Sequence, residues 1–574
     1  MKKRYAAGML AAIAFAVTSA AGAASDAASA PADLVLIHGK IHTEDAGRSV
    51  AQALAVRGNS IVAVGTDREV SALVGPATRK VDLGGRVVLP GIIDAHVHPA
   101  ESAQDFGKCS LEDKALKPSE IKARVAACLR KQPGERGEWF EAIMVNPSGL
   151  TLSLADLDSI SPDRPLMLTG ADGHTVWVNS AALKLAKITA ATKNPSGGHI
   201  EHDPAGAPTG TLRDTAAEIA AAAKPKASLE HEVMLLDKAL NAMRAIGITS
   251  VQDASVDDHA MQIYKRLYDT HRLNMRVRGS FHLQDLHESA ASLIDTAVRF
   301  RAKWAVDPDF LRADAIKLFA DGVIEYPSQT AALLEPYLDA EGRPTRNRGP
   351  SYFMQDNLNR IVTAADAAGL TVHIHAIGDR AVRSSLDAFA DARKHNGALD
   401  NRGQIAHLEL IDPADFARFK ELGVIANFQL LWAQLDDYSE GATMQYIGPA
   451  RSRYLYPARS LRDAGAKIAG GSDWGVSSFD AFIAMEHAMT RSEQRGRPPL
   501  LPEQSLTLQD MVDAYTINAA FALKQERTTG SIEAGKRGDF IVLDRDIFSM
   551  DPFDLHETKV TATYLDGRVV YAAK

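Results

Sequence analysis

The sequence predicts an α/β protein in which a TIM-like (β/α)8 barrel is flanked by a discontinuous β-sandwich. Two observations carry this prediction. Short apolar segments alternate with helix-like stretches through the middle of the chain, as barrel strands and helices do. Short β-rich runs separated by Gly-containing turns occur at both ends. The 574 residues, 46% hydrophobic and 24% charged, exclude a disordered or fibrous protein.

Eight short apolar segments are the expected barrel strands, and several of them end in Gly, Asp or His. They are residues 87–96, 247–253, 276–282, 315–321, 371–375, 404–407, 423–429 and 467–473. About 150 residues separate the first segment from the second, far more than an ordinary loop contains. We therefore expect a barrel over residues 89–527 with an inserted subdomain near residues 100–230.

The β-rich runs at the two ends of the chain cover residues 33–88 and 528–574. Neither segment is long enough to bury a good core alone. We therefore expect the two ends to pair into one β-sandwich.

The charge of the chain indicates which class of molecule it binds. The chain has 64 Lys and Arg against 72 Asp and Glu, a formal net charge of −8, and no basic run beyond its first residues. A surface for nucleic acid is therefore not expected, and a small molecule is the expected substrate.

Residues 1–23 have the pattern of a secretory signal. Three basic residues at 2–4 precede an apolar run over 5–17, and small residues end the segment at 21–23. An uncleaved membrane anchor is the alternative, but the run is shorter than the ~20 residues that cross a bilayer. We expect cleavage near Ala24 and a mature protein that is periplasmic or secreted, free of the membrane.

The chain has two cysteines, Cys109 and Cys128, which are too few for a thiolate zinc site. In an oxidising compartment their spacing is compatible with one disulfide that closes a loop. Two free, partly buried thiols are the alternative.

Two histidines lie where the first expected strand ends. His96 and His98 are two residues apart, so their side chains point to the same side of a strand. Two adjacent imidazoles suit a borderline cation such as zinc. An HxH pair alone is a weak signal, and its place at a strand end after Pro-Gly strengthens it.

Four further polar residues lie within other expected strands or at their ends. Lys317 lies in an apolar segment, where an unmodified ammonium would be costly to bury. His375, His407 and Asp473 each end another segment. Taken singly, they have structural alternatives: a salt-bridged lysine, hydrogen-bonded core histidines and a helix N-cap. Their joint occurrence at strand ends, where barrel enzymes assemble their chemistry, favours one site.

Together these motifs resemble the metal-dependent amidohydrolase superfamily, and within it the YtcJ-like branch, amidohydrolase family 3. The resemblance covers nearly the whole mature chain. It is carried by residues 34–37, 90–98, 172–180, 317–322, 375–380, 471–473 and 530–536. It implies a barrel with a flanking β-sandwich and one or two divalent metal ions per chain, usually zinc. The architecture of the branch also makes a homodimer a reasonable expectation.

The resemblance implies a metal-binding role for the residues at the strand ends. His96 and His98 would bind the more buried metal, and His375 and His407 would bind the second. Lys317 would be carboxylated and bridge the two metals. Carboxylation would also remove the cost of burying Lys317 as a cation.

Catalytic and substrate-binding roles are implied for four residues. Asp473 would contact the first metal and act as general base and acid toward a metal-activated hydroxide. His174 would donate to the carbonyl or the tetrahedral oxyanion, and Trp177 and Asn179 would shape the pocket. The alternative is that this segment only builds the fold of the insertion.

We therefore expect an exported metal-dependent hydrolase that cleaves a C–N bond of a small molecule, in an amide, an N-acyl compound or a cyclic amide. An esterase and a deaminase with one metal are alternatives on the same scaffold, and Lys317 favours the two-metal hydrolase over the deaminase. A non-enzymatic ligand-binding or regulatory protein is a third alternative. It would be expected to lack a metal ligand or Asp473, and all of these residues are present.

Overall fold

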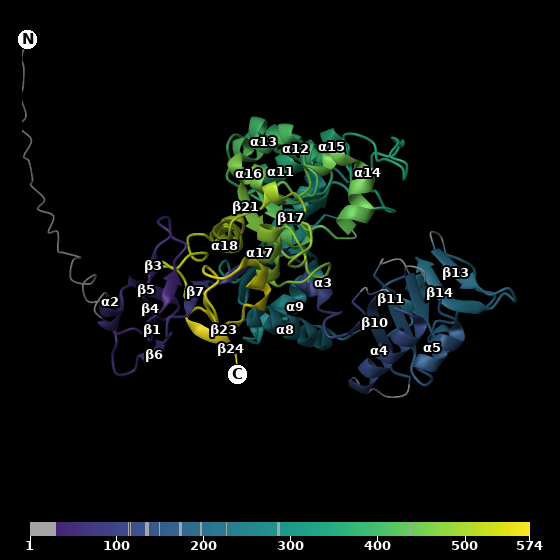
Figure 1. The fold of residues 1–574 in the computed structure, drawn as a ribbon, viewed down its shortest axis with the longest axis horizontal. Coiled ribbons are helices and arrows are strands. Elements are labelled where there is room, and N and C mark those ends of the chain that lie inside the picture. Colours follow the sequence, from purple (N-terminus) through teal and green to yellow (C-terminus); the bar gives the residue numbers. More distant parts are fainter. Residues whose placement is uncertain are drawn as a thin grey trace, which may run out of the picture. The chain divides into compact units, whose positions relative to one another are not determined.

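The computed structural model describes residues 30–112, 114, 116–131, 137–147, 150–171, 175–195, 198–225, 227–283, 288–436 and 438–573. The expected signal segment, residues 1–23, lies outside them. The chain forms two compact units, which are Met1–His98 with Asn241–Met261 and Leu273–Lys574, and Pro99–Leu240 with Gln262–Arg272 (Figure 1). Among the described residues, no helix has both the length and the apolar character that a membrane span requires.

An eight-stranded parallel sheet forms the centre of the first unit and confirms the predicted barrel. Its strands are β8 (Ile92–Val97), β15 (Ile248–Val256), β16 (Arg276–His282), β17 (Leu311–Phe319), β18 (Thr371–Ala376), β19 (Gln404–His407), β20 (Ile425–Phe428) and β21 (Lys467–Gly470), each paired with the next. Two backbone hydrogen bonds join the first strand to the segment after the last. Asp473 N donates to His96 O over 2.8 Å, and His98 N donates to Trp474 O over 2.7 Å. The barrel is therefore nearly closed just where the candidate ligands lie.

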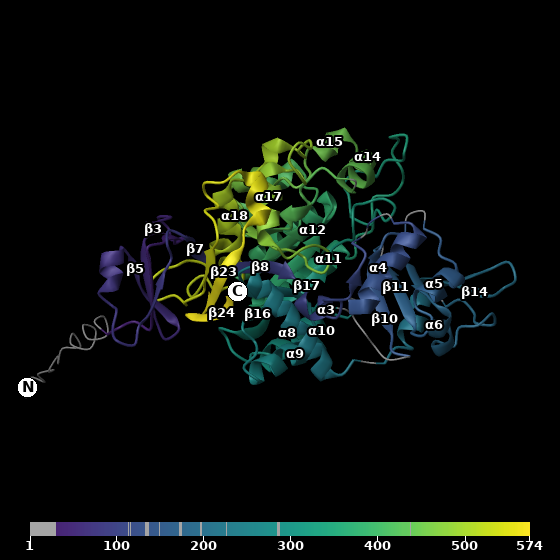
Figure 2. The same cartoon turned by 60° about the horizontal axis from the view of Figure 1, so that its bottom comes forward.

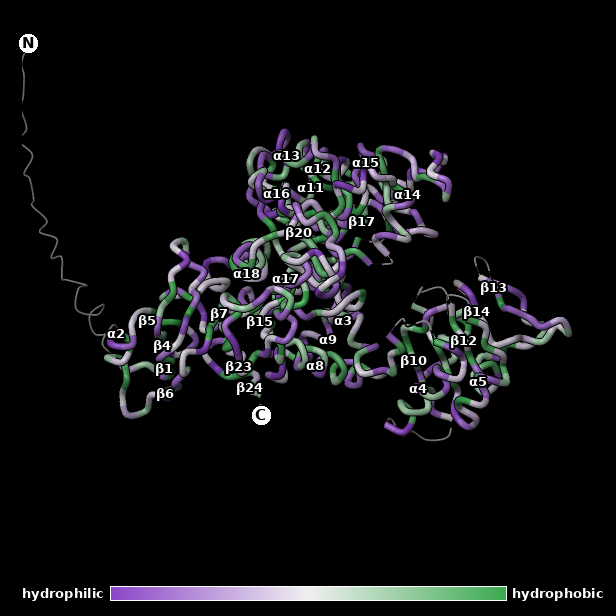
Figure 3. The backbone as a smooth tube through the Cα atoms, viewed as in Figure 1, coloured by the Kyte–Doolittle hydropathy of each residue, from purple (hydrophilic) through white to green (hydrophobic). Residues whose placement is uncertain are grey.

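Helices cover the outside of the barrel (Figure 2). They include α10 (Ala290–Lys303), α11 (Gln355–Ala367), α12 (Asp379–Asn396), α13 (Phe416–Leu422), α16 (Ala458–Asp463), α17 (Ala481–Thr490), α18 (Leu508–Tyr515) and α19 (Ile517–Ala522). In α11 the buried residues Leu358, Ile361, Val362 and Ala365 recur every three or four positions, so one apolar stripe packs inward. Strands β8, β18 and β20 are buried along their whole length, as parallel strands covered on both faces are. Figure 3 shows hydrophobic stretches running through the strands and hydrophilic ones in the outer loops.

The expectation of one strand over residues 87–96 was wrong. Val87–Pro90 forms β7 in a separate sheet, and the chain enters the barrel only at Ile92. Gly91 lies between the two strands, and the backbone passes so close to Thr249 there that a Cβ would collide with the Thr249 side chain. Because the apolar run is continuous, the change of sheet could not be recognised from the sequence.

The two ends of the chain build two sheets that pack together. One holds β5 (Ser60–Gly65), β4 (Ala53–Arg57), β1 (Leu34–Ile37) and β6 (Arg79–Asp82). The other holds β24 (Arg568–Ala572), β23 (Val560–Leu565), β22 (Phe540–Leu543), β7, β2 (Lys40–His42) and β3 (Val50–Ala51), so that purple and yellow segments pair in Figure 1. Leu36 and Leu54 of the first sheet share a buried cluster with Val88, Phe540 and Tyr564 of the second. The predicted discontinuous sandwich is therefore confirmed.

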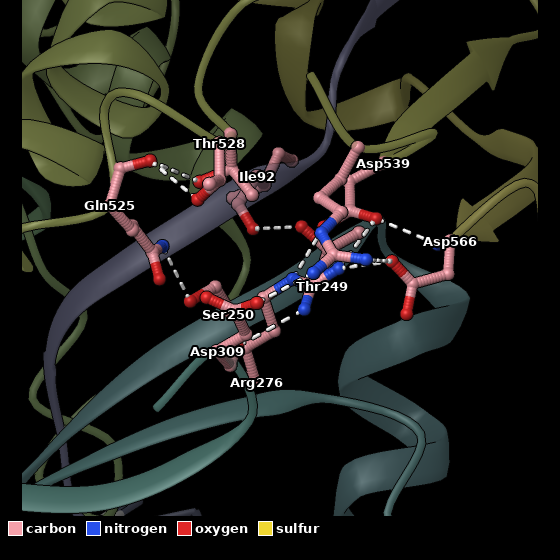
Figure 4. A network of polar contacts seen from close by, with 11 residues as sticks. Ile92, Thr249, Ser250, Arg276, Asp309, Gln525, Thr528, Asp539 and Asp566 are labelled. Carbon is pink, nitrogen blue, oxygen red and sulfur yellow. Dashed lines mark hydrogen bonds and ion pairs between the residues drawn. The ribbon is translucent and has the colours of Figure 1, made fainter. Parts of the chain in front are cut away.

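A buried ion pair joins this sandwich to the barrel (Figure 4). Arg276, the first residue of β16, donates to Asp539 over 2.7 and 3.2 Å and to Asp566 over 2.6 Å. Arg276 and Asp539 are each only 3% exposed in their side chains. Nearby, the Thr249 hydroxyl donates to Ile92 O over 3.3 Å. The contacts of Arg276 hold the amino end of β16 against the C-terminal sheet.

The second unit has its own six-stranded sheet and core. The sheet holds β13 (Gly198–His202), β14 (Pro208–Asp214), β12 (Thr175–Val178), β11 (Leu166–Gly170), β10 (Phe140–Val145) and β9 (Cys109–Ser110). Its helices include α4 (Pro118–Lys131), α5 (Leu154–Ile160), α6 (Ser180–Leu185) and α7 (Ala216–Ala221). Cys109 of β9 and Cys128 of α4 form a disulfide with Cα atoms 5.7 Å apart, which confirms the bonded alternative.

Candidate metal centre

Three histidines surround one carboxylate at the carboxyl ends of the barrel strands. The Nε2 atoms of His98 and His96 lie 3.0 and 3.3 Å from Asp473 Oδ1. His407 Nδ1 lies 3.9 Å from Asp473 Oδ2. Strands β8 and β19 and the segment after β21 therefore bring together four of the six predicted metal ligands.

The other two predicted ligands, His375 and Lys317, come from neighbouring strands. The ring centroid of His375, on β18, lies 4.4 Å from that of His407, and His375 Nε2 lies 3.1 Å from Gly322 O. Lys317, on β17, is fully buried, with Nζ 4.7 Å from the ring centroid of Phe319. The six residues thus come from β8, β17, β18, β19 and the segment after β21, at the carboxyl ends of the barrel strands.

Buried nitrogens in this cluster have no hydrogen-bond partner within the described part of the chain. They are His96 Nε2, His98 Nδ1, His407 Nδ1 and Lys317 Nζ. One ligand atom each from His96, His407 and Asp473 lies within 4.8 Å of the others. Unpaired buried nitrogens beside a carboxylate are costly unless another group satisfies them. Imidazole and carboxylate donors are the set that zinc takes, so these residues fit a divalent cation.

Burial and neighbouring groups shift the pKa values of several residues in this cluster. Burial and the nearby Lys317 amine hold the pKa of His96 well below its ordinary range, so its imidazole is neutral. Burial opposes charge on Asp473, but the hydrogen bond from His98 outweighs it and keeps the pKa of Asp473 low. Burial lowers the pKa of Lys317 to about 7. The cluster therefore offers a neutral imidazole, a carboxylate and a lysine that is easily deprotonated.

The backbone is strained at two of the strand ends. His407 has φ 77° and Asp473 has φ 53°, in the left-handed region that residues with a side chain rarely adopt. Such strain persists only where the surrounding structure holds it, and it gathers at functional sites. Gly471 allows the last strand to approach the first, because a Cβ there would lie 2.6 Å from His96 Cβ.

Residues 79–571 match the family described as "Amidohydrolase family". The chain belongs to the amidohydrolase family. This membership confirms the predicted family and the predicted enzyme class, a hydrolase of C–N bonds.

Individual relatives span almost the whole of this amidohydrolase. The N-substituted formamide deformylase of Arthrobacter pascens is 31% identical over 94% of this chain and 98% of its own length. The protein LONG AFTER FAR-RED 3 of Arabidopsis thaliana is 29% identical over 94% of this chain and 92% of its own. The crystal structure of an uncharacterized metal-dependent hydrolase from Pyrococcus furiosus covers 89% of this chain and 99% of its own, with 24% identity and a TM-score of 0.71. That structure shares the fold.

The three residues predicted in the insertion lie either outside the described residues or within the second unit. His174 lies outside the described residues. Trp177 is 2% exposed in a hydrophobic core of the second unit. Asn179 caps α6, and its amide donates to Ser161 O and Arg164 O. For Trp177 and Asn179 these contacts favour the structural alternative, and a role in substrate binding stays a prediction.

Two residues of the amidohydrolase site were not singled out from the sequence. Asp321, fully buried after β17, accepts from the backbone N–H groups of Ile377 and Gly378 and lies 3.6 Å from His375 Nε2. His373 Nε2 lies 2.9 Å from His96 Nδ1. His373 precedes His375 by two residues on one strand, so the alternation that linked His96 to His98 would have indicated it.

Proposed function

We propose that this amidohydrolase uses a divalent metal, zinc, to cleave the amide-type C–N bond of a small N-acyl compound. The observation that carries the proposal is the buried cluster of His96, His407 and Asp473 with its unpaired nitrogens. The 31% identity to an N-substituted formamide deformylase supports an acyl group on nitrogen as the substrate feature.

His96, His98, His375, His407 and Asp473 would hold the metal. When bound, the cation polarises a carbonyl and lowers the pKa of a water molecule. These five residues lie within or shortly after four barrel strands, so the barrel positions their nitrogen and oxygen atoms.

Asp473 would move the proton during the reaction. Its low pKa keeps it a carboxylate, and His98 holds one of its oxygens at 3.0 Å. The carboxylate accepts a proton from the water as the water oxygen adds to the carbonyl carbon. It then delivers that proton to the leaving nitrogen as the C–N bond breaks.

Lys317 would become an anionic ligand by carboxylation. A pKa of about 7 leaves a large fraction of this amine neutral at physiological pH, which is the form that attacks carbon dioxide. The new N–C bond yields a carbamate and releases one proton. The carbamate would add an anionic oxygen ligand to the histidines and Asp473, which supports two metals per chain.

We also propose that the protein acts after export. The basic, apolar and small-residue pattern over residues 1–23 supports a cleaved signal. The Cys109–Cys128 disulfide supports an oxidising compartment such as the periplasm.

Zinc content and turnover of the purified chain test the proposal together. We expect one or two zinc ions per chain by elemental analysis, and hydrolysis of N-substituted formamides, N-acyl amino acids or cyclic amides. Asp473→Asn should keep most of the metal and lose at least about a hundredfold in turnover, the lower range for a general base. Asp463→Asn, the same change on the exposed surface of α16, is the matched control. Full activity in Asp473→Asn, or no bound zinc in the wild type, would refute the proposal.

A further inference from the structure

A chain of buried polar side chains runs from the metal centre into the barrel interior. His96 Nδ1 lies 2.9 Å from His373 Nε2, and Gln252 Nε2 lies 2.6 Å from His373 Nδ1. Gln404 Nε2 donates to Gln252 Oε1 over 3.1 Å. All four side chains belong to fully buried residues on barrel strands. The chain of contacts is therefore shielded from water.

Backbone carbonyls determine which group donates and which accepts in each of these side-chain hydrogen bonds. Gln404 Nε2 also donates to Ala522 O over 3.1 Å, and Gln404 Oε1 accepts from Asn427 Nδ2, which donates to Ala95 O over 2.9 Å. A carbonyl oxygen can only accept, so the two amides cannot turn over without losing these bonds. Gln404 therefore presents its amide nitrogen to Gln252 Oε1.

The same order of donors and acceptors extends to the histidines of the metal centre. Because Gln252 Oε1 accepts from Gln404, Gln252 Nε2 points toward His373 Nδ1 and toward Ser280 Oγ, which lies 3.0 Å away. His373 accepts at Nδ1, so a neutral His373 carries its proton on Nε2 and donates it to His96 Nδ1. A neutral His96 then carries its own proton on Nε2, the nitrogen 3.3 Å from Asp473 Oδ1.

Metal binding at His96 Nε2 requires the opposite arrangement. The proton of His96 must lie on Nδ1 and that of His373 on Nδ1, where Gln252 must accept it through Oε1. Both rings stay neutral, but the Gln252 amide must turn over and place its nitrogen against the nitrogen of Gln404. One buried hydrogen bond is then lost.

We propose that Gln252 is a positioning residue that lowers the metal affinity of this site, acting through His373 on the tautomer of His96. This inference rests on the proposed metal site. Outer partners of a ligating histidine commonly change metal affinity by about 10- to 100-fold, because they fix its tautomer. A single lost hydrogen bond corresponds to about tenfold at this site.

Two variants remove the conflict by different routes. In Gln252→Glu, both carboxylate oxygens accept, so His373 Nδ1–H, the Ser280 hydroxyl and the Gln404 amide are satisfied at once. In Gln404→Met, which adds no charge, the Gln252 amide is free to turn over. We expect both variants to bind Zn²⁺ about tenfold more tightly than the wild type in competition with a chromophoric chelator.

Charge alone could also tighten binding in Gln252→Glu, so a double variant separates the two causes. His373→Phe in the Gln252→Glu background keeps the charge and breaks the link to His96. The gain must then disappear. Thr371→Val is the control, because Thr371 is buried on the same strand and bonds to Arg278 and Asn401 O instead. Its Zn²⁺ affinity should stay within about twofold of the wild type.

The outcomes separate this inference from the function it rests on. A gain in Gln252→Glu that vanishes with His373→Phe, together with a gain in Gln404→Met, supports it. An unchanged affinity in both single variants, or a gain that survives His373→Phe, overturns it while the metal site stands. A wild type that binds no Zn²⁺ overturns both.

Discussion

Replacing Lys317 by methionine should stabilise the protein that lacks metal and carbon dioxide. Lys317 is fully buried, and burial lowers its pKa from 10.5 to about 7. At 1.36 kcal/mol per pH unit, burial of this lysine therefore lowers the free energy of unfolding by up to about 5 kcal/mol. The cost arises at pH values at which the unfolded chain carries the amine as an ammonium. Methionine is similar in length and carries no such cost.

The sign of the pH dependence follows from linkage. Below pH 7 both states bind the proton, so the full cost destabilises the wild type. Between pH 7 and 10.5 the folded state has released the proton and the unfolded state still holds it, so the free energy of unfolding rises with pH. Lys317→Met lacks this rise. Its advantage should therefore be largest at acidic pH and shrink steadily above neutrality.

Urea unfolding of chelator-treated protein in carbon-dioxide-free buffers at several pH values measures the difference. Lys394→Met, on the exposed end of α12, is the control and should show no such trend. A constant difference between the wild type and Lys317→Met across the series would refute the reasoning. A variant less stable than the wild type at acidic pH would refute it as well.

Two further substitutions test how the barrel is held together. Gly471→Ala should weaken zinc binding by at least about tenfold in a chelator competition, because the added Cβ would lie 2.6 Å from His96 Cβ. Gly441→Ala, where a Cβ meets nothing within 4 Å, should leave it unchanged. Arg276→Met should lower the free energy of unfolding by about 3–5 kcal/mol in urea, since it leaves Asp539 buried without its cation. Adding Asp539→Leu should recover part of that loss, and a further loss instead would contradict the account.

The positions of the ligands could be predicted from local pattern. Each barrel strand is a short apolar run, and a polar residue that ends such a run stands out by itself. Strand alternation also pairs His96 with His98 without any knowledge of the fold. The predicted barrel and sandwich follow from the same local signals, because each element carries its own periodicity.

Other features depended on partners far apart in the chain. His96 meets His373 across 277 positions, and Gln404 meets Gln252 across 152. The break at Gly91 depends on Thr249, and the structural environment of Asn179 depends on carbonyls that its own segment does not contain.

The sequence by itself determined the fold class, the family and the residues at the strand ends, because short-range periodicity and motifs encode them. Only the tertiary structure decided which buried donors and acceptors meet. A hydrogen bond requires its two groups to come within about 3 Å in the right orientation, and that depends on how all the strands close together.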